Sequence, residues 1–202
     1  MSYIKVVVPQ KASGRLEKIY QRVQAPDGQV DNVLQIHSLR PHTLEGHMAL
    51  YKAVLHHSGN RLPEWYLEAV GVLVSSLNGC SYCAGHHVTG LQRLLRAEKL
   101  DHTAYISALD RNEPGEPFTL REQLGLAYAR KLTHTPGQVE AADIDALRNA
   151  GFDDGEILEL NQVAAYFAYA NRTVSGLGVN IEGEVLGQSP LTGDDESGWS
   201  HG

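Results

Sequence analysis

The stretch LEAVGVLVSSLNGCSYCAGHH, residues 67–87, decides the fold of this 202-residue chain and contains both of its cysteines. Its first half carries apolar residues at three- and four-residue steps, which predicts a helix that begins after Pro63. Asn78-Gly79 is a turn-forming pair, and a second helical pattern covers 81–97. We therefore expect two consecutive helices joined by a short break, with the cysteines at the start of the second helix.

Helical periodicity continues on both sides of this stretch. Thr119 and Glu122 form a capping-box pattern, which predicts the start of another helix. We expect helices over 42–57, 63–76, 81–97, 101–109, 119–134, 141–150 and 153–177. Only 4–8 is strand-like, and there we expect an extended N-terminal arm. The sequence predicts one all-α domain, residues 1–186, and a loose tail over 187–202, where turn formers and acids replace apolar residues.

Composition and charge exclude several classes of protein. The chain is 42% hydrophobic and 20% charged, which is typical of an ordinary globular protein. Its formal net charge of −7 and its lack of a Lys/Arg cluster argue against nucleic-acid binding. We find neither a signal-peptide core at the N-terminus nor an 18-residue apolar run that could span a membrane. We therefore expect a cytoplasmic protein without a membrane partner.

The two cysteines, Cys80 and Cys83, have the spacing Cys-x-x-Cys. In a reducing cytoplasm this spacing indicates a catalytic or metal-binding pair rather than a structural disulfide. If a helix begins near Ser81, Cys83 lies in its first turn, where free N–H groups and the positive end of the helix dipole favour a thiolate. Three helical residues separate the Cα atoms by about 5 Å, within the range of about 4.4–6.8 Å that a disulfide requires. The pair can therefore close reversibly.

A histidine and a carboxylate are available to these thiols. His87 follows Cys83 by four residues, so the two side chains lie about 40° apart on one helix face, whereas His86 points about 60° the other way. We therefore expect His87 to act as the base or proton carrier. The preceding helix offers Glu64 and Glu68 one turn apart on one face. Glu68 lies deeper in that helix, but spacing alone does not separate the two acids.

Two other interpretations of the cysteines stay open at this point. Free cysteine is commonly buried, so Cys80 and Cys83 can be inert packing residues. A zinc site can use both cysteines and His87, with Glu68 or His47 as the fourth ligand, although structural zinc usually recruits a second Cys/His pair. Otherwise we expect His47 at the surface or at an interface.

The run Glu68-x11-Cys80-Ser-Tyr-Cys83-x3-His87 resembles the signature of the alkylhydroperoxidase D (AhpD) and carboxymuconolactone decarboxylase superfamily, specifically its peroxidase-related branch. The resemblance is dense over 64–91. It is looser around 41–57, 117–135 and 160–179. It implies an AhpD-like multi-helix bundle that forms homo-oligomers and carries a thiol-dependent peroxidase or disulfide-reductase site.

The same resemblance implies a role for each residue of the motif. Cys83 attacks the peroxide oxygen and becomes a sulfenic acid, and Cys80 condenses with it to a disulfide. Glu68 and His87 relay protons. Tyr82 occupies an accessory position between the cysteines, where some members have His; it can hydrogen-bond a water or the carboxylate but cannot shuttle protons near pH 7 as His can.

The resulting prediction is a peroxidase-related oxidoreductase that reduces hydroperoxides through a dithiol/disulfide cycle. It has no metal or cofactor of its own, and an external dithiol regenerates it. Two alternatives remain. The first is a decarboxylase-like, non-redox enzyme on the same fold. Some superfamily members lack the cysteine pair, so its presence here argues against this alternative. The second is a thiol redox sensor without turnover.

Overall fold

The structure is a computed structural model that describes residues 2–25, 28–111 and 115–188. Within these ranges the chain forms helices and no strand. The helices are α1 (Gly14–Val23), α2 (Asn32–Gln35), α3 (Pro41–Tyr51), α4 (Glu64–Leu77), α5 (Ser81–Ala97), α6 (His102–Asp110), α7 (Leu120–His134), α8 (Ala141–Asn149) and α9 (Asp154–Leu177). The predicted all-α class is confirmed.

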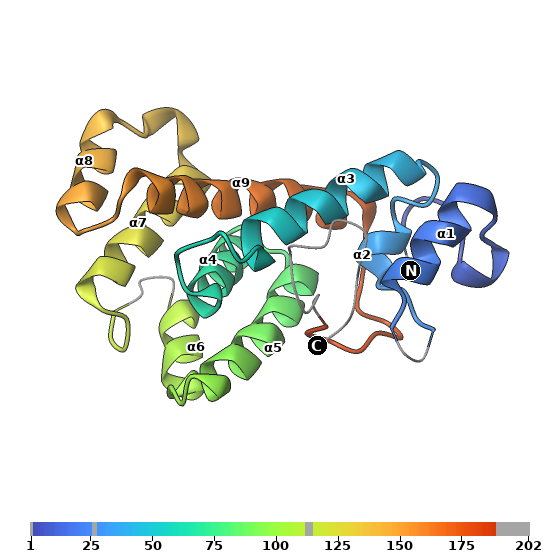
Figure 1. Ribbon diagram of the computed structural model, residues 1–202, viewed down its shortest axis with the longest axis horizontal. Helices are drawn as coiled ribbons and strands as arrows, with labels where there is room; N and C mark the ends of the chain where they lie inside the picture. The colour runs from blue at the N-terminus through green and yellow to red at the C-terminus, as the bar shows by residue number, and fades with distance from the viewer. Residues whose placement is uncertain (1, 26–27, 112–114, 189–202) are drawn as a thin grey trace.

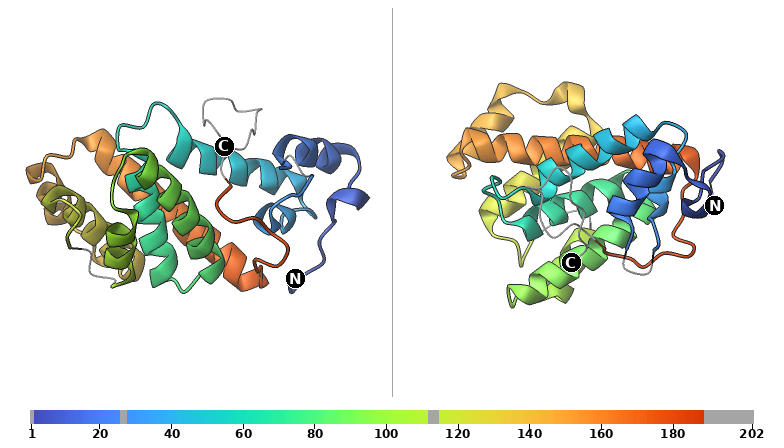
Figure 2. Two further views of the ribbon diagram at one scale, coloured as in Figure 1. Left: turned by 90° about the horizontal axis from the view of Figure 1, so that it is seen from below. Right: turned by 45° about the vertical axis from the view of Figure 1, so that its right-hand side comes forward.

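The long helix α9 runs along the long axis of the molecule, with α7 and α8 at one end and α1 and α2 at the other (Figure 1). Figure 2 shows α4 and α5 side by side, crossing α9. The centre of the bundle is α4, which contacts α5, α7 and α9. Its residues from Tyr66 to Ser75 are all buried, as expected of a helix that is surrounded by others. The first half of the stretch 67–87 therefore lies in the central helix of the bundle.

Small residues let α9 approach α4 closely. A Cβ atom on Gly71 would lie 2.2 Å from Cε2 of Phe167, so no larger residue fits there without movement. Phe167 itself is fully buried. Because protein cores are packed at crystal-like density, the contact between Gly71 and Phe167 fixes the distance between α4 and α9.

The helix ends follow the local signals of the sequence. The predicted capping box is present: the Thr119 hydroxyl accepts the Glu122 N–H at 3.3 Å, and the Glu122 carboxylate accepts the Thr119 N–H at 2.7 Å. A second box, formed by Asp153 and Glu156, begins α9. The predicted helix over 42–57 is shorter, because α3 ends at Tyr51 and a π-helical turn, Lys52–His56, follows it.

The two ends of the chain add detail that the sequence analysis lacked. It did not predict α1 and α2. Residues 4–8 form neither helix nor strand, and the N–H of Val7 donates to Ser38 Oγ at 2.9 Å. Of the expected tail over 187–202, the structure describes Gly187 and Gln188, and 189–202 lies outside the described residues. No helix in the described ranges combines the length and apolarity that crossing a membrane requires.

Candidate active site

The two cysteines lie where the break after α4 meets the first turn of α5. Gly79 has a φ of +67°, which glycine adopts without strain, and the N–H of Cys80 donates to the Ser75 carbonyl at 2.9 Å. Cys80 is the N-cap of α5, and its Sγ accepts the Cys83 N–H at 3.4 Å. The two Sγ atoms are 2.6 Å apart, and both thiols are free and buried. The break and the helix start therefore place the sulfurs side by side.

The two thiols have opposite acidities. The hydrogen bond from the Cys83 thiol lowers the pKa of Cys80 to about 6, against the effect of burial and with help from the Cys83 N–H. The same hydrogen bond, together with burial, raises the pKa of Cys83. Within the pair, a negative charge is therefore favoured on Cys80 over Cys83. Helix position alone favoured Cys83, but the N-cap sulfur is the one that accepts the first-turn N–H.

A buried ion pair lies beside the thiols. Glu68, in the middle of α4, is 2% exposed, and its Oε2 is 2.7 Å from Nδ1 of His87 on α5. Burial raises the pKa of Glu68, but the charge and the hydrogen bond of the adjacent His87 lower it. The lowering effects are larger in sum, so the pKa lies below its ordinary value. An ionised carboxylate can only accept hydrogen bonds, so His87 donates its Nδ1–H to Glu68. Nε2 is then the ring nitrogen that can take part in proton transfer.

The structure distinguishes the two acids that the sequence left open. Glu64 is partly exposed, and its carboxylate pairs with Nδ1 of His56 at 2.7 Å. Glu68, one turn later, faces α5 and meets His87. The difference arises because α5 crosses the face of α4 that carries Glu68, and Gly90 leaves space for the carboxylate: a Cβ there would lie 3.9 Å from Glu68 Oε1.

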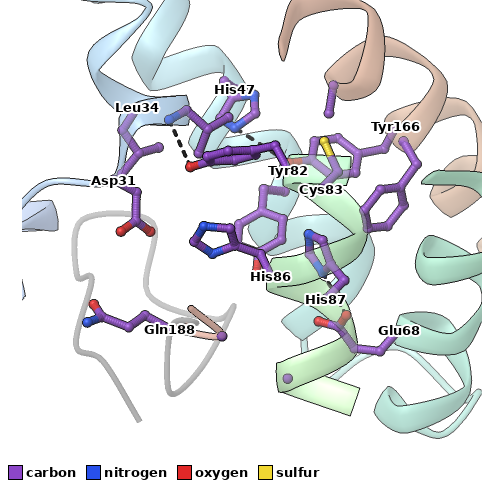
Figure 3. A pocket seen from close by; sticks show the side chains of 16 residues that line it. Asp31, Leu34, His47, Glu68, Tyr82, Cys83, His86, His87, Tyr166 and Gln188 are labelled. Atoms are coloured by element: carbon purple, nitrogen blue, oxygen red, sulfur yellow. Dashed lines mark hydrogen bonds and ion pairs between the residues drawn. The ribbon is translucent and has the colours of Figure 1, made fainter. Parts of the chain in front are cut away.

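Cys83 shares a cavity of about 60 Å³ with the Glu68 and His87 pair (Figure 3). Aromatic rings make up much of its wall. The other lining residues are Asp31, Val33, Leu34, His47, Tyr51, Tyr82, His86, Gly90, Tyr166, Phe167, Ala170, Gly187 and Gln188. Cys80 instead lines a second cavity of about 510 Å³ with Tyr3 and Ser175. The two cysteines therefore face different cavities.

Tyr82 is hydrogen-bonded away from the ion pair. Its hydroxyl donates to Glu184 Oε1 at 2.9 Å and accepts the Val33 N–H at 3.1 Å. Burial, and next the charge of Glu184, raise the pKa of Tyr82. These contacts link the residue between the cysteines to α2 and to the chain after α9, and not to Glu68 or His87.

Sequence reasoning missed several residues of the cavity. The expectation that His47 lies at the surface or at an interface is wrong for this chain, because it is 4% exposed and lines the cavity. Burial, and next the charge of nearby His37, lower its pKa to about 3, which favours the neutral ring near pH 7. His86 also lines the cavity; its ring lies 4.6 Å from that of Tyr82, and its Nε2 is 3.5 Å from Glu184 Oε2.

The histidines and acids of the site pair with one another instead of converging on one point. Across the described part of the chain, no three His, Cys, Asp or Glu side chains are arranged so that they could hold a metal ion. The geometry offers a dithiol, an ion pair beside one of its sulfurs and a cavity. This set of groups suits thiol chemistry with proton transfer.

Solved structures with the same fold include proteins described as peroxidase-related. An uncharacterized peroxidase-related protein from Silicibacter sp. TM1040 is 25% identical, with 88% of this chain and 90% of that chain covered and a TM-score of 0.76. A peroxidase-related protein with an AhpD core, from Ralstonia eutropha JMP134, is 23% identical, with 92% and 97% covered and a TM-score of 0.72. The debrominase Bmp8 is 18% identical, with 89% and 94% covered and a TM-score of 0.66. No protein-family model and no curated protein sequence matches the chain.

The fold and the paired thiols define an AhpD-like helical protein. The chain has the fold of these AhpD-like proteins, as the motif over residues 67–87 implied. The peroxidase-related neighbours support an enzyme with a redox or hydroperoxide-related function. The debrominase indicates that the fold also carries other chemistry, so the reaction has to be argued from the site.

Proposed function

We propose that the protein is a thiol-dependent, peroxidase-related oxidoreductase that reduces hydroperoxides through a Cys80/Cys83 dithiol cycle. The observation that carries this proposal is the cavity that Cys83 shares with the Glu68 and His87 pair. A peroxide bound there meets a sulfur and a proton donor, while Cys80 lies 2.6 Å from the reacting sulfur. These are the parts that reduction of a peroxide by a dithiol requires.

In the first step, the proton of Cys83 moves across the sulfur–sulfur contact to Cys80, so that the charge passes to the sulfur that faces the cavity. The Cys83 thiolate attacks one peroxide oxygen, and the O–O bond breaks. Cys83 becomes a sulfenic acid, and the other oxygen leaves as an alkoxide or hydroxide. His87 gives a proton to this leaving oxygen, while Glu68 holds the ring through Nδ1 and stabilises its positive charge.

In the second step, the Cys80 sulfur attacks the sulfenic sulfur of Cys83, water leaves, and the disulfide forms. An external dithiol then reduces this disulfide by two electrons and becomes a disulfide itself. The cycle needs no metal or cofactor resident in the protein. Its partners are a small-molecule hydroperoxide and the dithiol reductant, and we expect it to run in the cytoplasm, in a homo-oligomer.

The experiment that tests this proposal counts thiols before and after one equivalent of hydroperoxide. The wild-type chain should lose two thiols per peroxide. Cys80→Ser should stop at a sulfenic acid that a sulfenic-acid reagent traps on Cys83, as read by mass spectrometry. Cys83→Ser should consume peroxide far more slowly, and consumption at the wild-type rate would refute the assignment.

A matched pair of acid variants tests the relay. Glu68→Gln should slow thiol oxidation by about 100-fold or more, because loss of positioned acid–base catalysis typically costs 10² to 10⁴. Glu64→Gln changes a carboxylate one turn away on the same helix and should leave the rate unchanged. Equal effects of the two variants would show that Glu68 has no special role.

The same protein samples separate the alternatives. Turnover that survives removal of both cysteines would support a non-redox, decarboxylase-like enzyme. A disulfide that forms slowly and supports no turnover with any dithiol would support a redox sensor. Rapid loss of two thiols followed by turnover with a dithiol is the result that the peroxidase proposal requires.

A further inference from the structure

The chain turns back after α9 and crosses the cysteine side of the bundle. Gly178 ends α9 with a φ of +67°, and residues 179–188, which we call the strap, then run toward α2 and α5 (Figure 1). The side-chain amide of Asn32, at the start of α2, donates to the carbonyl of Asn180 at 3.0 Å. The strap therefore bridges two elements that are far apart in the sequence.

One buried carboxylate holds the strap in place. The Glu184 side chain is 4% exposed. It accepts the Tyr82 hydroxyl at 2.9 Å and the backbone N–H of Asn32 in a short hydrogen bond, and its second oxygen lies 3.5 Å from Nε2 of His86. Both hydrogen bonds reach Oε1, whereas Oε2 makes no hydrogen bond within the described residues. A buried carboxylate needs such donors, so the two bonds at Oε1 and the closed position of the strap depend on each other.

The end of the strap is pressed against α5. Gly187 has a φ of +80°, and a Cβ atom there would lie 2.6 Å from Thr89 Cγ2 and 3.2 Å from the Gly90 nitrogen. The carbonyl of Gly187 accepts Nη1 of Arg93 at 3.0 Å. This position therefore needs glycine both for its backbone conformation and for the close approach to the helix that carries Cys83.

This placement makes the strap part of the wall around Cys83. Gly187 and Gln188 line the cavity, and Figure 3 shows the Gln188 side chain on the side where Asp31 lies. One water needs about 10–15 Å³ of such volume, and a cavity that accepts benzene has about 150 Å³. A cavity of about 60 Å³ therefore has room for a peroxide group but not for an added phenyl ring while the strap is closed.

We propose that Glu184 is a specificity-determining residue: its carboxylate latches the strap and so restricts the cavity at Cys83 to small hydroperoxides such as hydrogen peroxide. Bulkier hydroperoxides react only when the latch opens. The substrate class rests on the proposed function, whereas the latch itself concerns access to Cys83 and can be tested without any peroxide.

The test measures access to Cys83 with two reagents of the same chemistry and different size. In a Cys80→Ser background, Cys83 is the only thiol of the chain. We would compare its rate of alkylation by iodoacetamide with that by N-benzyl iodoacetamide. The ratio of the two rates cancels any change in the pKa of the thiol, because both reagents attack the same sulfur.

Glu184→Ala in this background should raise the relative rate of the benzyl reagent by at least about tenfold, because loss of charge-assisted hydrogen bonds shifts a closed-to-open equilibrium by that order. Glu182→Ala removes an exposed carboxylate from the same strap and should leave the ratio unchanged. Tyr82→Phe removes one bond of the latch and should raise the ratio less. It also serves as the second variant if Glu184→Ala does not fold.

The latch would be overturned if, in the folded Glu184 and Tyr82 variants, the ratio of the two rates stays within about twofold of the background. Loss of the hydrogen bonds of Glu184 should change this ratio by more than that. An equal rise in Glu182→Ala would overturn it as well. With both cysteines present, Glu184→Ala should raise kcat/KM for cumene hydroperoxide relative to hydrogen peroxide. If the wild type consumes neither peroxide, the proposed function fails, and the alkylation ratios still decide the latch.

Discussion

Replacing Glu68 by Gln keeps the size of the side chain and removes its charge, which tests whether the buried ion pair stabilises the fold. Glu68 is 2% exposed and lies 2.7 Å from His87 Nδ1. A hydrogen bond to a charged group contributes about 1.5–3 kcal/mol, and a neutral one about 0.5–1.5. Because Gln still accepts the Nδ1–H, we expect Glu68→Gln to lower the free energy of unfolding by about 1–2 kcal/mol at pH 7.

The pH dependence of this loss follows from the pKa of Glu68. The pKa is lower in the folded protein than its ordinary value of 4.5, because the charge and hydrogen bond of His87 outweigh burial. The carboxylate therefore contributes its full stability above the unfolded-state pKa, and this contribution is lost as the pH falls through the folded-state pKa. The difference between wild type and Glu68→Gln should be largest near neutral pH and shrink below about pH 4.

Urea denaturation at several pH values, followed by tryptophan fluorescence, measures this difference directly. The control is Glu64→Gln, whose carboxylate is 43% exposed and should cost no more than about 1 kcal/mol. The reasoning is refuted if Glu68→Gln is as stable as the wild type at pH 7, if the loss is equally large at pH 7 and below pH 4, or if Glu64→Gln costs as much.

Three further predictions concern the packing, the dithiol and a distant helix cap. Gly71→Ala should lower the free energy of unfolding by about 1–3 kcal/mol, measured by urea denaturation, because the added methyl overlaps the Phe167 ring. The rate of alkylation of the wild-type dithiol by iodoacetamide should rise with pH, with a midpoint near pH 6, the pKa of Cys80. In Cys83→Ala the midpoint should move up toward 9, because the hydrogen bond from Cys83 is the main cause of the low pKa. Thr119→Ala should cost about 0.5–2 kcal/mol of stability, in a thermal or urea melt, and leave the alkylation rates unchanged.

The helices were predictable where local chemistry decides their ends. Pro63 precedes α4, the capping box begins α7, and the pattern over 81–97 matches α5. The helix α1 carries apolar residues at positions 16, 19, 20 and 23, so its helical spacing was also present in the sequence. The single turn of α2 and the π-helical turn after α3 have no such local signal, because packing against other parts of the chain stabilises them.

The candidate site divides in the same way. Cys80, Cys83 and His87 lie within two turns of one helix, so their spacing alone places them together. Glu68 lies on another helix, and spacing left it equivalent to Glu64 until the crossing of α4 and α5 separated them. The acidity of the thiols needed coordinates as well, because the first-turn position favours Cys83, whereas the observed hydrogen bonds stabilise the charge on Cys80.

Glu184 marks the limit of reasoning from sequence. Its hydrogen-bonding partners Tyr82 and Asn32 lie 102 and 152 residues away along the chain, and the residues around it, 179–188, form no helix or strand. Composition describes the average polarity of such a segment, but a single acid that becomes buried must find partners, and those partners then fix the path of the backbone around it. One carboxylate can therefore order a segment that has no regular secondary structure, and only the three-dimensional arrangement of α2 and α5 identifies which carboxylate it is.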